Sequence, residues 1–150
     1  MSEGRQDEAK QVLATVRAEA LRLGLRDLEA ESMRLLAQVL AKQGTLQEAS
    51  DLSGQALAIA DRLGISDVDY LFTCGDISAA AGSRDAAATY YGRALDRVGS
   101  VVEAKCPRRL KQYYLSSRDV PGYAAKLADL LRGTGRETEV RSLKSRLGLK

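Results

Sequence analysis

Apolar residues along this chain recur at the three- and four-residue intervals of a helix surface. Ala9, Val12, Val16, Ala20 and Leu23 follow one another at spacings of 3, 4, 4 and 3 residues. This spacing places an apolar stripe on one side of an α-helix. No stretch sustains the two-residue alternation of a half-buried strand. The sequence therefore predicts an all-α protein.

The helical pattern occurs twice with a period of 40 residues. The segment from Gly4 to Asp27 aligns without gaps with the segment from Gly44 to Asp67, and nine of the 24 aligned positions are identical. The matches include both ends of the segment and the shared sequence Arg-Leu-Gly before the closing Asp. A fixed period in the tens of residues is typical of repeat architectures.

Glycines and polar residues divide the chain into eight expected helices. Glycine ends a helix readily because it adopts positive φ, and we expect this role for Gly24, Gly44, Gly64, Gly82 and Gly99. A side-chain acceptor can cap the free N–H groups of the next helix, and we expect this role for Asp27, Thr45, Asp67 and Ser83.

The expected helices span residues 5–23, 27–43, 46–63, 67–81, 84–98, 106–116, 120–132 and 136–147. The short connections between them favour antiparallel neighbours. Pro107 either opens the sixth helix or kinks a longer helix that begins near Val101, and we favour the first.

Two spans carry small and large residues in a common order. Residues 30–63 provide Leu36, Ala37, Leu40, Gly44, Ala49, Ser53 and Ala56, and residues 68–101 provide Cys74, Gly75, Ser78, Gly82, Ala87, Tyr91 and Ala94. This order resembles the tetratricopeptide repeat (TPR), a 34-residue pair of antiparallel helices. A third span, 104–132, matches more weakly through Leu110, Tyr114, Leu127 and Leu130. The longer period of 38–40 residues is similar to that of TPR proteins in signalling and transcription regulation.

The resemblance implies a single domain over residues 1–150, an α-solenoid of antiparallel helix pairs in a right-handed superhelix. It comprises about three repeats and a capping helix at 136–147, whose inner face carries Val140, Leu143 and Leu147. Helix 5–23 corresponds to the second helix of a pair whose first helix is missing. The chain is therefore either a fragment of a longer array or has an end that docks on another surface, and self-association through this helix is one alternative.

The resemblance also implies a concave groove lined by the first helix of each pair, which binds a peptide, a helix or a sibling domain. Charged residues would recognise the partner at the rim, and Phe72 would be an apolar anchor. The alternative for Phe72 is packing against a neighbouring helix. The expected groove residues are Glu31, Arg34, Gln38, Lys42, Asp69, Phe72, Asp76, Lys105, Arg108 and Gln112.

Composition removes most catalytic chemistry. The chain has no histidine and only two cysteines, without a CxxC pair, and it lacks the Gly-Lys-Ser/Thr sequence of a phosphate-binding loop. We therefore expect no catalytic residues, no metal site and no cofactor, and a role as a scaffold or adaptor rather than an enzyme. The absence of a long apolar run or a signal-peptide core predicts a cytoplasmic protein without membrane contact.

Charge is distributed unevenly along the chain. Residues 1–100 contain 11 Lys or Arg against 15 Asp or Glu, whereas residues 101–150 contain 12 against 5. The stretch KCPRRLKQYY combines four cations with two tyrosines, which suits an acidic partner or stacking on single-stranded nucleic acid. Because Leu110 and Tyr114 lie four residues apart and have the spacing of core positions, we regard nucleic acid as the weaker alternative.

Overall fold

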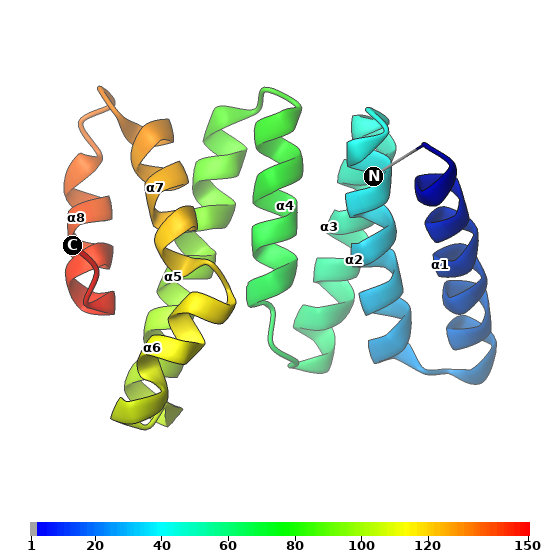
Figure 1. The fold of residues 1–150 in the computed structure, drawn as a ribbon, viewed down its shortest axis with the longest axis horizontal. Coiled ribbons are helices and arrows are strands. Elements are labelled where there is room, and N and C mark those ends of the chain that lie inside the picture. The colour runs from blue at the N-terminus through cyan, green and yellow to red at the C-terminus, as the bar shows by residue number, and fades with distance from the viewer. Residues whose placement is uncertain (1–2) are drawn as a thin grey trace.

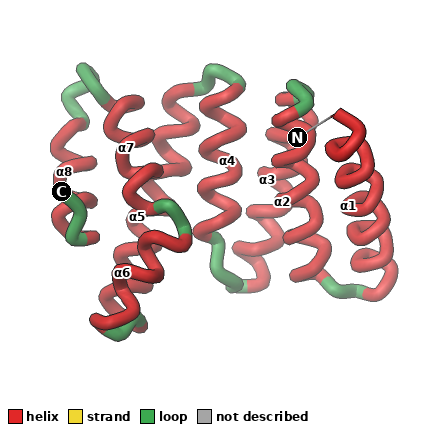
Figure 2. The backbone as a smooth tube through the Cα atoms, viewed as in Figure 1, coloured by secondary structure: helices red, strands yellow, loops and turns green. Residues whose placement is uncertain are grey.

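The computed structural model describes residues 3–150 and contains eight α-helices in that range, with no strand (Figures 1 and 2). This arrangement confirms the all-α prediction. The helices are α1 Glu3–Leu23, α2 Arg26–Lys42, α3 Leu46–Leu63, α4 Val68–Ala80, α5 Arg84–Lys105, α6 Arg108–Ser117, α7 Val120–Leu131 and α8 Glu137–Leu147.

The helices stand side by side in a row, and most neighbours in sequence are antiparallel neighbours in space (Figure 1). The most extensive contacts join α1 to α2, α2 to α3 and α4 to α5. In the view of Figure 1, α2, α4 and α7 form a front layer, and α3 and α5 lie behind it. The front layer therefore brings together helices that are distant in sequence.

Small residues are buried where the helices of a pair approach one another. A large side chain at these points would hold the helices apart, because protein interiors have no spare volume. Most of the small positions shared by the two sequence spans are buried in this way. The buried ones are Ala37, Ala49, Ser53, Ala56, Cys74, Gly75, Ser78, Ala87 and Ala94.

Helix ends follow the glycine prediction with one exception. Gly24, Gly44, Gly64 and Gly82 have φ between 65° and 82°, in the left-handed region that ends a helix. Gly99 instead lies inside α5, which continues to Lys105. Its missing Cβ leaves room for the guanidinium group of another helix, so the glycine is present for close packing rather than for a turn.

The prediction of side-chain caps is wrong. Thr45, Asp67 and Ser83 occupy the N-cap positions of α3, α4 and α5, but none of their side chains makes a capping hydrogen bond. Asp27 lies in the first turn of α2, after an N-cap at Leu25. The Asp67 carboxylate is instead bound by the Arg97 guanidinium, with Nε 3.1 Å from Oδ1 and Nη2 3.2 Å from Oδ2.

The region around Pro107 differs from the expected third repeat. Pro107 does precede α6, as predicted, but the C-terminal end of α5 and the beginning of α6 project beyond the row (Figure 1). The helix that packs on α5 is α7, and α8 then packs on both α5 and α7. Val140 and Leu147 of α8 are buried and Leu143 is partly buried, which confirms the expected inner face of this helix.

The two ends of the row differ in how well they are covered. In α1 only Ala20 is fully buried, and the Val12 side chain is exposed, because α1 has extensive contacts with α2 alone.

Leu110 of α6 is 49 % exposed, so its assignment to the core is wrong. Within the part of the chain that the structure describes, no helix combines the length and apolar character needed to cross a membrane.

Candidate functional site

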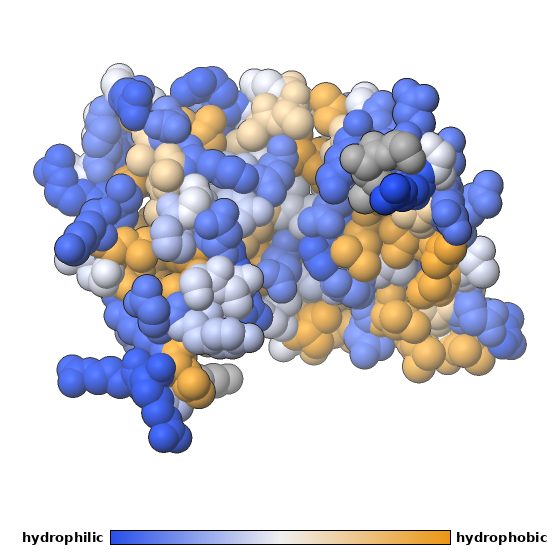
Figure 3. Space-filling view, in the orientation of Figure 1, coloured by the Kyte–Doolittle hydropathy of each residue, from blue (hydrophilic) through white to orange (hydrophobic). Residues whose placement is uncertain are grey.

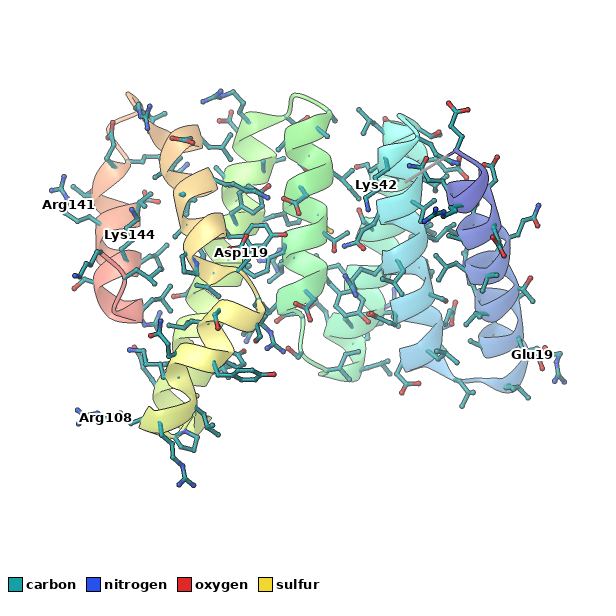
Figure 4. The ribbon with its side chains drawn as sticks, in the orientation of Figure 1. Glu19, Lys42, Arg108, Asp119, Arg141 and Lys144 are labelled. Atoms are coloured by element: carbon teal, nitrogen blue, oxygen red, sulfur yellow. The ribbon has the colours of Figure 1, made fainter. Side chains whose placement is uncertain are left out.

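A groove of about 350 Å³ opens on the front layer, between α2, α4 and the turn that joins α6 to α7. We call it the front groove. Each wall contributes polar side chains, and Asp119 points into this region from the turn (Figure 4). The lining residues are Arg34 and Gln38 from α2, Asp69, Phe72 and Thr73 from α4, and Ser116, Ser117, Arg118, Asp119 and Tyr123 from the third wall.

Thr73 connects the first two walls of the front groove. Its hydroxyl oxygen accepts hydrogen bonds from Gln38 Nε2 at 3.2 Å and from Arg34 Nη1 at 3.4 Å. The same hydroxyl donates to the backbone carbonyl of Asp69 at 2.8 Å. The side chains of α2 are therefore oriented across the groove by a residue that sits on the opposite helix.

The charge of the α2 wall is fixed across the physiological range. Arg34 forms a hydrogen-bonded ion pair with Glu31, which lowers the pKa of the Glu31 carboxyl and raises the pKa of the Arg34 guanidinium. The guanidinium also lies over the Tyr70 ring, 5.8 Å from its centroid. Burial and the neighbouring Glu31 carboxylate raise the pKa of Tyr70 to about 12. Near pH 7 the α2 wall therefore presents one cation and one anion, and α4 places the neutral Tyr70 phenol beside them.

Asp76 connects α4 to both α5 and α7. Its Oδ1 accepts a hydrogen bond from the Tyr91 hydroxyl at 2.6 Å, and its Oδ2 accepts one from the Tyr123 hydroxyl at 2.6 Å. Lys126 Nζ lies 3.1 Å from Oδ1. Burial, followed by the bond to Asp76, raises the pKa of both tyrosines above the ordinary value. The Asp76 carboxylate therefore holds both α5 and α7 against α4.

The Tyr91 ring reaches Asp76 only because residue 75 is glycine. A Cβ at Gly75 would come within 2.5 Å of both Cε1 and Cδ1 of the Tyr91 ring, far closer than van der Waals contact. The glycine is buried in the middle of α4, where glycine ordinarily costs about 0.5–1 kcal/mol of stability relative to alanine. We infer that the close approach of the aromatic ring compensates for this cost.

The third wall contains a guanidinium with an unused donor. Arg118 Nε is buried and has no hydrogen-bond partner among the described residues, and the nearest carboxylate oxygen, Asp69 Oδ1, is 3.9 Å away. The guanidinium carbon lies 4.5 Å from the centroid of the Tyr114 ring, which holds it beside the groove. The next residue, Asp119, has φ of 49°. Within residues 3–150 it is the one residue other than glycine that has a positive φ. Backbone strain of this kind costs about 1–3 kcal/mol and is concentrated at functional sites.

Only part of the predicted residue set comes together in this groove. Arg34, Gln38, Asp69 and Phe72 line it, and Glu31 and Asp76 are bonded to its walls. Lys42 is exposed at the far end of α2, away from the groove. Arg108 and Gln112 are exposed on the projecting helix α6, outside the lining, and the Lys105 side chain lies outside the described residues.

Phe72 is not the exposed anchor that we expected. Its side chain is only 3 % exposed, and its ring stacks on Tyr123. The alternative interpretation, packing against a neighbouring helix, is therefore correct. The third wall was missed because α7 occupies the place assigned to α6. Pro121 in the first turn of α7 marks the start of that helix, which the sequence predicted, but it does not indicate which helix packs on α5.

Metal chemistry finds no support in the described side chains. Residues 3–150 contain no group of three or more His, Cys, Asp or Glu residues placed to hold a metal ion. Cys74 and Cys106 are both free thiols, and burial raises the pKa of Cys74.

Comparison of the chain with protein-family models, with curated proteins and with solved structures gave no match.

Proposed function

We propose that this chain is a non-enzymatic protein-interaction module, a scaffold or adaptor built as a TPR-like α-solenoid. Two features support the finer assignment of the fold. Helices α2 to α5 alternate between a front and a rear layer (Figure 1), and the small residues that distinguish the repeat pattern are buried. The cytoplasmic location and the role in signalling stay predictions from the sequence.

The observation that carries the proposal is the unused donor at the front groove. A buried guanidinium N–H without an acceptor loses free energy, about 1–3 kcal/mol or more for a charged group. Arg118 Nε is in this position beside Arg34 and Gln38, whose side chains also carry N–H donors. A ligand with a carbonyl oxygen would supply the missing acceptor of Arg118 Nε.

The dimensions and charges of the groove favour a short extended peptide. Its volume of about 350 Å³ is at the low end of ligand pockets, which range over roughly 300–1,000 Å³. That space holds a few side chains rather than a whole helix. Asp69 and Asp119 can accept from peptide N–H groups, while the arginines can donate to peptide carbonyls. The groove therefore matches the alternating donors and acceptors of a peptide backbone.

A random 12-residue peptide library displayed on phage provides the test. Peptides selected on the wild-type chain would be compared on an Arg118→Ala/Gln38→Ala variant and on a matched Arg108→Ala/Gln112→Ala control, which removes the same residue types from exposed α6. We expect the groove variant to lose binding by about tenfold or more and the control to keep it. Equal binding to a correctly folded groove variant would show that the front groove is not the site.

A second candidate function involves the projecting helix α6. Its tip exposes Arg108 and Arg109, and the Tyr113 ring is 74 % exposed. Such a tip suits an acidic protein partner, and the affinity would fall steeply as salt is raised because the attraction is between exposed charges. Heparin retention that is unchanged by Arg108→Gln/Arg109→Gln would exclude this candidate.

A further inference from the structure

One edge of the row carries almost all of the exposed large apolar side chains. The connections α1–α2, α3–α4 and α5–α6 lie at this edge, which we call the α1–α2 edge (Figure 1). Within residues 3–150, every exposed large apolar side chain except Val12 lies here, and part of this surface is visible in Figure 3. The opposite edge has the same kind of helix connections but none of these side chains. This asymmetry indicates a selected surface rather than scattered exposure.

Three helices end in the same short sequence, Arg-Leu-Gly followed by Leu or Ile. These ends are Arg22–Leu25, Arg62–Ile65 and Arg146–Leu149. Their glycines have φ of 72°, 65° and 74°. In each, the N–H after the glycine donates to the carbonyl five residues earlier, at 2.8–3.2 Å. Because the three ends share one backbone conformation, each presents its Arg and Leu to the surroundings in a similar way.

At the end of α8, this Arg-Leu pair is covered: α5 binds the arginine, and the leucine is buried in the core that α8 shares with α5 and α7. Arg146 Nη1 lies 2.6 Å from Asp96 Oδ1, and Arg146 Nε lies 2.7 Å from Glu103 Oε1. Gly99 lies between these carboxylates, and a Cβ there would come within 2.9 Å of the guanidinium carbon. Leu147 is 1 % exposed. The covering surface is therefore one helix face with two carboxylates seven residues apart, about two turns, around a glycine.

At the ends of α1 and α3, the same pair faces solvent. Leu23 is 53 % exposed and Leu63 is 44 % exposed. Arg22 pairs only with Glu19 of its own helix, and such an exposed pair contributes little to stability. Arg62 forms no ion pair within the described part of the chain. The arginine and leucine at the ends of α1 and α3 therefore lack a partner helix of the kind that α5 provides at the end of α8.

We propose that the ends of α1 and α3 dock an acidic amphipathic helix of a partner protein. This helix would resemble the face that α5 presents to α8, with two carboxylates seven residues apart around a small residue and an apolar side chain over the exposed leucine. Charge complementarity with Arg22 and Arg62 selects this occupant. Since α8 already occupies α5 in this chain, the helix comes from another molecule. The front groove is a separate surface, so the two proposals can fail independently.

The probe is a helix-stabilised synthetic peptide of residues 93–104, with the staple on the side away from Asp96 and Glu103. Stabilisation is needed because so short a helix is marginal in water. Titrated into the ¹⁵N-labelled full chain, it is expected to shift amide signals of residues 20–26 and 60–66. A peptide with Asp96→Asn and Glu103→Gln is expected to bind about tenfold or more weakly.

The matched protein variants separate this edge from the rest of the surface. Leu23→Ser/Leu63→Ser changes exposed side chains only, so we expect the fold to be kept and peptide affinity to fall about tenfold or more. Lys42→Gln/Arg132→Gln removes two cations at the opposite edge and is expected to leave affinity unchanged.

Three results would overturn the proposal. The first is affinity that the leucine variant does not change. The second is a set of shifts confined to residues 144–149, which would mean that the peptide merely displaces α5 from α8. The third is a dimer of the wild-type chain in sedimentation that Leu23→Ser/Leu63→Ser converts to a monomer. That result would make a second copy of the chain the occupant of the edge.

Discussion

Phe72 and Tyr123 stack face to face, with ring centroids 3.7 Å apart and ring planes 10° from parallel. The two residues are on α4 and α7, so the stack joins the third wall of the front groove to the centre of the row. Tyr123 also bonds Asp76 through its hydroxyl, and Lys126 Nζ lies 4.4 Å from the Tyr123 ring centroid. The position of the Arg118–Asp119 turn therefore depends on this aromatic contact.

Phe72→Ala is expected to destabilise the fold and disorder the third wall. Truncating a buried phenylalanine costs about 3–5 kcal/mol through lost burial and the cavity left behind. Urea unfolding followed by circular dichroism measures this change. Tyr113→Ala, which removes an exposed aromatic ring, is the control and is expected to change stability by less than about 0.5 kcal/mol. A similar loss in both variants would contradict the assigned role.

The bonds of Tyr91 and Tyr123 to Asp76 are expected to be coupled. Each hydroxyl bonds a carboxylate, so Tyr91→Phe or Tyr123→Phe alone should cost about 1.5–3 kcal/mol of unfolding free energy. In the double variant the losses are expected not to add, since both bonds share one acceptor. Strict additivity in the double-mutant cycle would indicate that the two tyrosines act separately.

Alanine is expected to have opposite effects at two helical glycines. Gly75→Ala should destabilise by about 1–3 kcal/mol, because its Cβ overlaps the Tyr91 ring. Gly54→Ala, in the middle of α3 with no atom within 4 Å of the added Cβ, should stabilise by about 0.5–1 kcal/mol. Thermal unfolding of the two variants measures both signs. A stabilising Gly75→Ala would show that Tyr91 can move away without cost.

Alkaline pH is expected to destabilise the fold through the buried tyrosines. The pKa of Tyr70 is about 12 in the folded chain against 10.0 for the free side chain, and those of Tyr91 and Tyr123 are also raised. Because the folded state holds these protons more tightly, the stability they contribute is complete below pH 10 and falls as pH rises toward 12. Urea midpoints between pH 8 and 11, with phenolate absorbance, measure the loss. A flat profile in the wild-type chain would disprove it.

The sequence predicted the helices well because their signals are local. Apolar spacing and left-handed glycines such as Gly64 act within one or two turns, and the structure reproduces them. Gly99 misled the prediction because the reason for it lies in Arg146, which is 47 residues away in the chain. The residues around a glycine do not show whether it ends a helix or makes room for a side chain of a helix that is distant in sequence.

The candidate site was predicted only in part. Arg34, Gln38 and Asp69 line the groove, and the resemblance to the TPR had implied them as groove residues. Arg118 and Tyr123 enter the groove because α7 rather than α6 packs on α5, and that choice depends on long-range contacts to Phe72 and Asp76. Pairing between distant helices is not encoded in any single window of the sequence.

The succession of contacts along the row has a consequence for the kinetics of folding. Most contacts join helices that are close in sequence, so assembly can proceed from local hairpins without first closing a long loop. Helix α1, which is attached mainly to α2, forms the open end of this succession. Unfolding is therefore expected to begin at α1 and to proceed helix by helix toward the aromatic contacts of Phe72, Tyr91 and Tyr123.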